Sequence, residues 1–165
     1  MRFTIEQRFR ARLTDVEDAY VSPELLATLA TLPKVGGAEL LEQRHEAGHV
    51  FQRVRYRFTA ELSAAVTAVV DPAKLTWVEE SMLDRATHVT TWKIVADHYG
   101  NRLDCRGEFA LREDGGGTVR RTDAEIKVRF PLVGGRVEKA IVAGLEQHAE
   151  AEQAAVEAYM TAFDH

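Results

Sequence analysis

The fold is decided by the stretch RVEKAIVAGLEQHAEAEQAAVEAYMTAF, residues 136–163. This stretch contains no proline, is rich in Ala, Glu and Gln, and follows a break at Gly134-Gly135. At about 1.5 Å per residue the predicted helix is roughly 40 Å long, well beyond the roughly three turns of an average helix. Its apolar residues recur at the spacing of one helix face, namely Val137, Ile141, Leu145, Val156 and Tyr159. A helix of this kind needs another layer of structure to cover its apolar face.

The covering layer is predicted by the middle of the chain, where apolar residues recur at every second position. The pattern is clearest in 49–59, because apolar residues and arginines alternate there. Turn residues at Ala47-Gly48 and at Asp114-Gly115-Gly116-Gly117 separate neighbouring strands. Since 60–70 contains no clear breaker, it is predicted to extend the strand before it. The predicted strands are 38–46, 49–59, 75–83, 87–96, 103–112 and 119–130.

The N-terminal part is predicted to form one strand over 2–10 and then two short helices. Thr14 or Asp15 serves as the N-cap of the first helix. Ser22-Pro23 supplies a cap and an initial proline for the second helix, which Pro33 ends. A strand, two short helices, a run of strands and a long helix, in this order, indicate an α+β fold.

Four stretches of the sequence carry a family resemblance, namely Val54–Phe58, Lys74–Ser81, Thr87–Trp92 and Pro131–Glu138. Together with the order of elements, which spans nearly the whole chain, they resemble the START-like (SRPBCC) superfamily of birch-allergen-like helix-grip proteins. The similarity is sharper to an uncharacterised, mainly actinobacterial branch of that superfamily. The resemblance implies a curved seven-stranded antiparallel sheet around the C-terminal helix, with an apolar ligand in a cavity between them. It implies no activity and no site residues, because none are established for that branch.

The composition is that of one ordinary cytoplasmic domain, residues 1–165. Charged residues make up 28% and the formal net charge is −5, which disfavours a nucleic-acid partner. No stretch is apolar enough to form a transmembrane segment, and the N-terminus lacks the apolar core of a signal peptide. The single cysteine, Cys105, excludes an internal disulfide and a cysteine metal cluster. Arg53, Arg55 and Arg57 share one face of a strand, which favours a solvated surface.

The sharpest motif is His45-Glu46-Ala47-Gly48-His49, an H-E-x-x-H pattern. On a helix it would place two imidazoles one turn apart to bind zinc, as in the membrane-anchored ATP-dependent metalloproteases whose motif it is similar to. Here Gly48 weakens a helix and the following residues keep the strand period, so the two histidines are predicted to flank a hairpin turn. We therefore predict no metal site and no cofactor.

The side chains predicted to face the cavity come from neighbouring strands and from the long helix. His88 and Trp92 share one strand face, and His148 lies beside the apolar stripe of the helix. An apolar cavity with a few polar groups is the usual form of a small-molecule site. The alternative is that the aromatic rings form core and the histidines are satisfied hydrogen bonders. The predicted ligand-binding residues are Tyr56, Trp77, His88, Trp92, Phe109, Leu145, His148 and Tyr159.

These observations leave three functions open, of which binding or transport of a hydrophobic small molecule is favoured. The ligand would be a lipid, an isoprenoid or a polyketide-like molecule held between sheet and helix. A cyclase or hydrolase would instead use His88 or His148 as acid or base, although no catalytic residue is assigned. A protein-interaction module would show a filled core and an exposed apolar patch. A homodimer also remains open.

Overall fold

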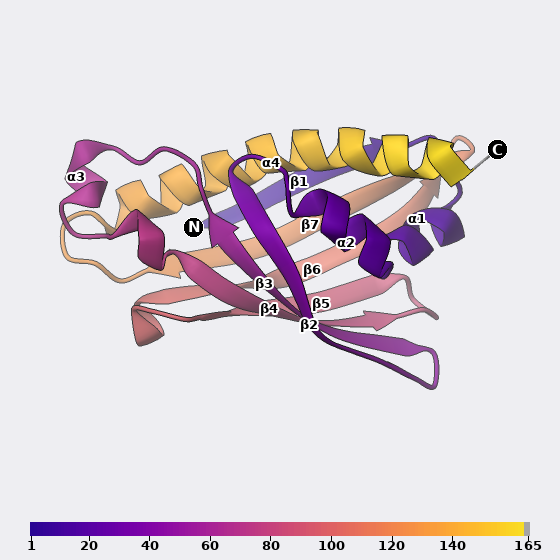
Figure 1. Cartoon of the computed structure of the whole chain (residues 1–165), viewed down its shortest axis with the longest axis horizontal. Coiled ribbons are helices and arrows are strands. Elements are labelled where there is room, and N and C mark those ends of the chain that lie inside the picture. The colour runs from indigo at the N-terminus through magenta and orange to yellow at the C-terminus, as the bar shows by residue number, and fades with distance from the viewer. Residues whose placement is uncertain (164–165) are drawn as a thin grey trace.

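One antiparallel sheet and one long helix organise the chain, of which the computed structural model describes residues 1–163 (Figure 1). The predicted α+β helix-grip architecture is confirmed, with a seven-stranded sheet and two short helices after the first strand. The strands are β1 (Arg2–Phe9), β2 (Val35–Glu46), β3 (His49–Phe58), β4 (Thr76–Asp84), β5 (Val89–Ala96), β6 (Leu103–Asp114) and β7 (Gly117–Val128). The helices are α1 (Leu13–Tyr20), α2 (Pro23–Leu29), α3 (Ala64–Thr67) and α4 (Gly134–Phe163), with short 3-10 turns η1 (Pro72–Lys74) and η2 (Gly100–Arg102).

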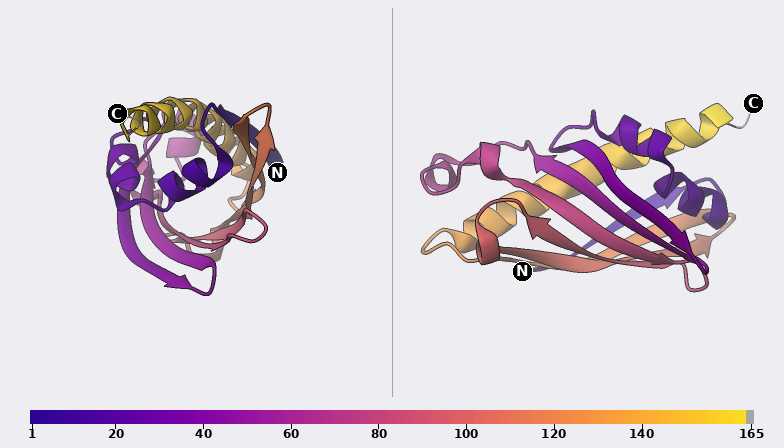
Figure 2. Two further views of the ribbon diagram at one scale, coloured as in Figure 1. Left: turned by 90° about the vertical axis from the view of Figure 1, so that its right-hand side faces the viewer. Right: turned by 60° about the horizontal axis from the view of Figure 1, so that its bottom comes forward.

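The sheet is curved, and α4 lies across its concave side. The strands follow the order β1-β7-β6-β5-β4-β3-β2, and each neighbouring pair is antiparallel. Viewed from one end of the molecule, the strands form an arc that α4 closes (Figure 2, left). The register of β2 shifts between Gly36 and Glu39 and again between Leu40 and Glu42, and bulges of this kind bend a strand. A sheet bent in this way encloses a space that a flat sheet would leave open.

The long C-terminal helix is confirmed, and it lies closest to β1 and β7. Val137 and Ile141 of α4 are buried in the main core on the inner face of the sheet. Gly144 lets the helix approach the sheet closely, because a Cβ atom at this position would lie 2.6 Å from the ring of Phe58. Among residues 1–163, no helix combines the length and the apolar character that crossing a membrane requires.

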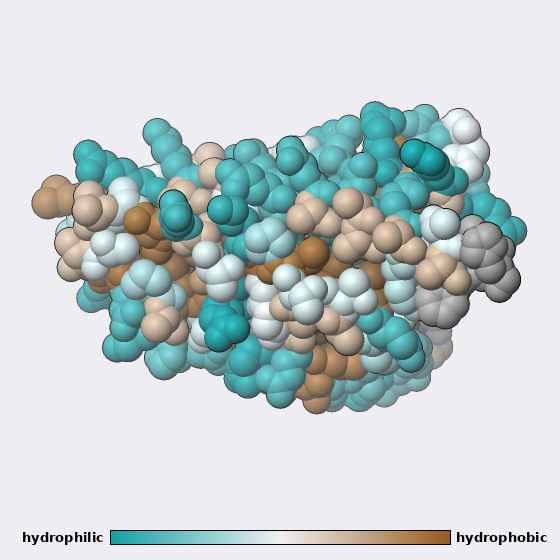
Figure 3. Space-filling model, turned by 45° about the horizontal axis from the view of Figure 1, so that its top comes forward, coloured by the Kyte–Doolittle hydropathy of each residue, from teal (hydrophilic) through white to brown (hydrophobic). Residues whose placement is uncertain are grey.

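The two short helices after β1 pack against the C-terminal half of α4 (Figure 1). The surface of the molecule around α4 mixes polar and apolar side chains (Figure 3). The hydroxyl oxygen of Ser22 accepts a hydrogen bond from the backbone N–H of Leu25, which confirms the predicted cap of α2. The first helix starts earlier than predicted, because its N-cap is Arg12, which makes no side-chain cap. Leu25 and Val156 are fully buried in the core cluster that joins α1, α2 and α4. This cluster fixes the two short helices at one end of the sheet.

Two predictions about local structure are wrong. Residues 60–70 do not extend β3: they form a loop that contains α3, where the hydroxyl of Ser63 accepts a hydrogen bond from the N–H of Val66. Val66 and Val70 are buried one helical turn apart, and a short apolar run of this kind fits a helix as well as a strand. His88 is not a strand residue, because β5 begins after it and its φ of 58° places it in a left-handed turn.

Replacing Gly144 by leucine is expected to disturb the packing of α4 against the sheet and to destabilise the protein. The new side chain would collide with the buried ring of Phe58, and overpacking of this kind costs about 1–3 kcal/mol. Ala143→Leu is the matched control, because Ala143 is exposed on the same helix. Urea denaturation should show a lower free energy of unfolding for Gly144→Leu alone. Equal stability of the two variants would contradict this packing.

Candidate functional site

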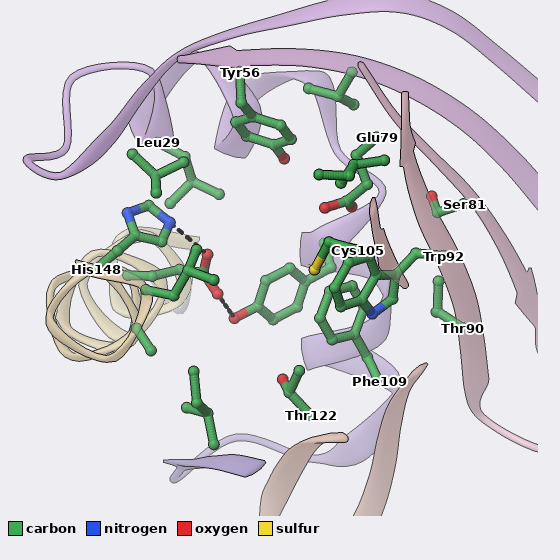
Figure 4. Close-up of a pocket in the computed structure, with 18 of the residues that line it drawn as sticks. Leu29, Tyr56, Glu79, Ser81, Thr90, Trp92, Cys105, Phe109, Thr122 and His148 are labelled. Carbon is green, nitrogen blue, oxygen red and sulfur yellow. Dashed lines mark hydrogen bonds and ion pairs between the residues drawn. The ribbon is translucent and has the colours of Figure 1, made fainter. Parts of the chain in front are cut away.

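A cavity of about 190 Å³ lies between the inner face of the sheet and α4. Its wall is mostly apolar, and α1, α2 and all the strands contribute to it. Figure 4 shows the rings of Tyr56, Trp92 and Phe109 around this space, with α4 on the opposite side. An engineered cavity of about 150 Å³ is enough to hold benzene. The cavity therefore has room for a molecule with one or two rings.

Most of the predicted ligand-binding residues line this cavity, namely Tyr56, Trp77, Trp92, Phe109, Leu145 and His148. The rings also pack against one another: Trp92 stacks on Phe109 with their centroids 5.2 Å apart, and the centroids of Tyr56 and Trp77 are 6.2 Å apart. The aromatic wall is thus partly core, as the alternative interpretation of the sequence expected. Contact of these residues with a ligand remains a prediction.

His88 and Tyr159, the other two predicted residues, lie outside the cavity wall. His88 occupies the turn between β4 and β5, where its Nδ1 lies 2.7 Å from Oε2 of Glu17, a buried residue of α1. The hydroxyl of Tyr159 lies 2.8 Å from that of Ser22 at the start of α2. Both side chains therefore tie the short helices to their neighbours. The sequence placed them wrongly because it does not reveal where β5 begins or which residues of α4 meet α2.

A buried ion pair joins β7 to α4 at one side of the cavity. Arg120 donates from Nη1 to Oε1 of Glu152 at 3.1 Å, and the two side chains are only 11% and 12% exposed. Gln7 ties this pair to β1, because it donates to the same Glu152 oxygen at 3.1 Å and accepts from Arg120 at 2.8 Å. The hydroxyl of Tyr20 donates to that oxygen at 2.7 Å, and Nε2 of His148 lies 3.2 Å from the other. We call these five residues the Arg120 cluster.

The charges of the Arg120 cluster balance each other without a ligand. Burial by itself would raise the pKa of Glu152, but the charge of Arg120 and the hydrogen bonds with His148 and Tyr20 lower it to about 2. Burial opposes the charge of Arg120, yet the nearby Tyr20 and Glu152 outweigh it and raise the pKa of the guanidinium. The guanidinium carbon also lies 3.9 Å from the ring centroid of Phe109 and 4.1 Å from that of Tyr20. The ion pair therefore stays charged at neutral pH and is satisfied from within the chain.

Glu79 is the candidate functional residue that the sequence analysis missed. Its carboxyl group points from β4 into the cavity (Figure 4), and it forms no hydrogen bond or ion pair with other residues of the 1–163 region. Burial raises the pKa of Glu79 to about 7, while the charge of Arg120 opposes this rise and that of Glu152 adds to it. The missed signal is strand parity: Glu79 lies two residues after Trp77, so both side chains face the same side.

Cys105 also lines the cavity, where it is a buried free thiol. Burial, and next the nearby carboxyl group of Glu79, raise its pKa to about 12. A cysteine reacts as its thiolate, which is scarce at neutral pH when the pKa is this high. The thiol is therefore an apolar part of the wall and not a nucleophile.

The H-E-x-x-H residues form the β2–β3 hairpin and lie away from the cavity. His45 pairs with Val50 and Glu46 pairs with His49, and both histidines are exposed. The turn residue Ala47 has a φ of 47°, which a helix does not allow. The predicted hairpin is confirmed. In the part of the chain that the structure describes, no group of three or more His, Cys, Asp or Glu side chains is arranged to hold a metal ion.

Arg120→Met is expected to destabilise the protein by about 3–5 kcal/mol, because it leaves the carboxylate of Glu152 buried without its cation. Arg121→Met is the matched control: Arg121 pairs with Asp123 at positions that are 49% and 44% exposed, where an ion pair contributes about 1 kcal/mol or less. Chemical denaturation at neutral pH measures both variants. If Arg120→Met costs no more than Arg121→Met, the Arg120 cluster does not stabilise the fold.

Glu79→Gln is expected to make the protein less sensitive to rising pH. In the wild type, folding raises the pKa of Glu79 from 4.5 to about 7, so the folded state holds this proton more tightly. The resulting stability is fully present below about pH 4.5 and is lost as the pH rises through about 7. Between about pH 5 and pH 8 the wild type should therefore lose up to about 3 kcal/mol relative to Glu79→Gln. The control is Glu80→Gln on the opposite face of β4, which should keep the pH dependence of the wild type. If the free energy of unfolding of Glu80→Gln varied with pH as it does for Glu79→Gln, the raised pKa would not belong to Glu79.

Comparisons with known proteins agree with this architecture. The family model described as "Protein of unknown function (DUF2505)" matches residues 4–160 of the chain. A search of curated proteins finds no match. Among solved structures, TTHA0849 from Thermus thermophilus is 17% identical with a TM-score of 0.70, and 98% of each chain is covered. The Zhui aromatase/cyclase from Streptomyces sp. R1128 is 15% identical with a TM-score of 0.65, covering 98% of this chain and 93% of that one.

A third solved structure, Ara h 8.0201, is 14% identical with a TM-score of 0.60, and 98% of both chains is covered. At identities this low, the structural likeness shows a shared helix-grip fold and nothing more. The family model, in contrast, spans nearly the whole chain. The chain is therefore a helix-grip protein that belongs to the DUF2505 family.

Proposed function

We propose that this protein binds a hydrophobic small molecule in the cavity between its sheet and α4. The observation that carries the proposal is the cavity itself, about 190 Å³ enclosed by both layers and walled mainly by apolar and aromatic side chains. Left empty, an apolar cavity of this volume would cost on the order of 4 kcal/mol of stability. A bound ligand that fills this volume removes that cost and stabilises the folded state further by mass action.

The wall also indicates what kind of molecule fits. The stacked pair Trp92 and Phe109 and the neighbouring Tyr56 and Trp77 present flat, rigid surfaces. A polyketide-like or isoprenoid ligand with one or two rings matches these surfaces better than a long acyl chain, which would outgrow the volume. The carrier would act in the cytoplasm, as the composition predicts.

A cyclase or hydrolase is the second candidate, and two titratable groups in one cavity favour it. Glu79 and His148 both line the cavity, whereas His88 is removed from consideration by its place in the β4–β5 turn. The Nδ1 atom of His148 is buried and has no hydrogen-bond partner among the described residues. The solved aromatase/cyclase with the same fold shows that this architecture accommodates such chemistry in another protein. Conversion of an added ligand by the wild type, but not by Glu79→Gln, would favour this candidate.

Native mass spectrometry of freshly purified protein tests the binding function. We expect a bound species that adds the mass of a small molecule and that organic extraction releases, because the apolar wall retains such a ligand. A thermal-shift screen of isoprenoids and polycyclic aromatics is the complementary measurement. A ligand-free spectrum together with no thermal shift for any compound would contradict the proposal.

Leu145→Arg is expected to lower ligand retention at least about tenfold, because it places a long charged side chain in the cavity. Leu132→Arg is the matched control, since Leu132 is fully exposed outside the cavity. Trp92→Ala should also lower retention by removing one side of the aromatic wall. Circular dichroism confirms folding before retention is compared by native mass spectrometry. Unchanged retention in folded Leu145→Arg would place the ligand elsewhere.

A further inference from the structure

Polar side chains form a row across the middle strands of the sheet, on the cavity wall. The register pairs Gln52 of β3 with Ser81 of β4, and Ser81 with Trp92 of β5. Neighbouring strands are about 4.8 Å apart, so the amide, the hydroxyl and the indole lie side by side. Glu79 lies two residues from Ser81 on the same face of β4, and all four side chains line the cavity. We call Gln52, Glu79, Ser81 and Trp92 the polar row.

The polar row lacks hydrogen-bond partners among the described residues 1–163. Nε2 of Gln52 and Nε1 of Trp92 are buried, and neither has a hydrogen-bond partner among residues 1–163. Ser81 is 8% exposed, and in the same region its hydroxyl forms no hydrogen bond, as is also true of the carboxyl group of Glu79. Buried polar groups in native proteins are nearly always paired, because each unpaired one costs about 1–3 kcal/mol. Several unpaired groups side by side on a cavity wall indicate that their partner comes from outside the chain.

On the opposite side of the cavity the charged groups are paired, although Nδ1 of His148 has no hydrogen-bond partner among the described residues. There the Arg120 cluster satisfies its own charges, because Glu152 accepts from Arg120, Gln7 and Tyr20. A ligand with a carboxylate would therefore find no free cation in this cluster. Near the polar row it would meet the carboxyl group of Glu79, and two like charges in a water-poor site repel strongly.

Resting on the binding function proposed above, we propose that the polar row is a hydrogen-bonding subsite for the carbonyl or hydroxyl oxygens of an uncharged ring compound. The N–H groups of Gln52 and Trp92 donate to these oxygens, and Ser81 adjusts its hydroxyl to suit. The rings of Tyr56 and Phe109 flank the row and hold the ring system of the ligand. Glu79 discriminates against carboxylate-headed ligands such as fatty acids.

Three compounds with the same ring system test the subsite by isothermal titration calorimetry at about pH 8.5, where Glu79 is mostly ionised. They are 2-acetylnaphthalene, which carries a carbonyl, 2-ethylnaphthalene, which lacks oxygen, and 2-naphthoate, which is anionic. We expect the acetyl compound to bind at least about tenfold more tightly than each of the other two. Tighter binding of 2-naphthoate, or equal binding of the acetyl and ethyl compounds, would overturn the subsite while leaving the binding function intact. No binding of any compound would count against both.

Variants that remove the polar atoms of the row locate the effect. In the double variant Gln52→Leu and Trp92→Phe, the preference for the acetyl over the ethyl compound, taken as the ratio of their two affinities, should fall about tenfold. At about pH 8.5, where Glu79 is mostly ionised, Glu79→Gln should raise the affinity for 2-naphthoate at least about tenfold, and the control Glu80→Gln should not. An unchanged preference in the double variant, or an equal gain in both glutamine variants, would overturn the assignment. Retained binding of 2-ethylnaphthalene shows in each case that the cavity is folded.

Discussion

The buried ion pair between Arg120 and Glu152 is the contact on which the arrangement of sheet and helix depends. It joins the middle of β7 to α4 in a place from which water is largely excluded, and Gln7 extends it to β1. A buried charge without its partner is far more costly than an exposed one. The ion pair therefore fixes the position in which α4 packs against the sheet. Gly144 supports the same position of α4 about two turns earlier in the helix, where the helix backbone meets the ring of Phe58.

The position of α4 makes the two walls of the cavity different. Because α4 lies closest to β1 and β7, side chains on the inner faces of β3, β4 and β5 line the cavity. The charged groups near α4 are paired with one another, although Nδ1 of His148 has no partner, whereas among the described residues the polar row has none. The same packing that stabilises one wall therefore leaves the other wall able to bind. A ligand would supply the hydrogen-bond partners that the polar row lacks among the described residues.

The helix-grip fold by itself does not decide between a carrier and an enzyme, because the same architecture accommodates both kinds of protein. The decisive feature is local. Glu79 is a carboxyl group in an apolar wall, with its pKa raised by burial to about 7, so both of its protonation states are populated near neutral pH. Such a group can donate a hydrogen bond to a bound carbonyl, and it is also where acid–base chemistry would have to begin.

The sequence by itself determined the order of the elements, the long helix, and the hairpin nature of the H-E-x-x-H segment, because periodicity and turn residues act locally. It also identified aromatic residues such as Trp92 that line the cavity, since strand parity is visible in the chain. Only the tertiary structure decided that 60–70 forms a loop with α3, that His88 belongs to a turn, and which polar groups meet. The Arg120 cluster is built from residues far apart in sequence and the polar row from three neighbouring strands, and strand register and the packing of α4 bring them together. Those long-range pairings leave no periodic trace in a single sequence.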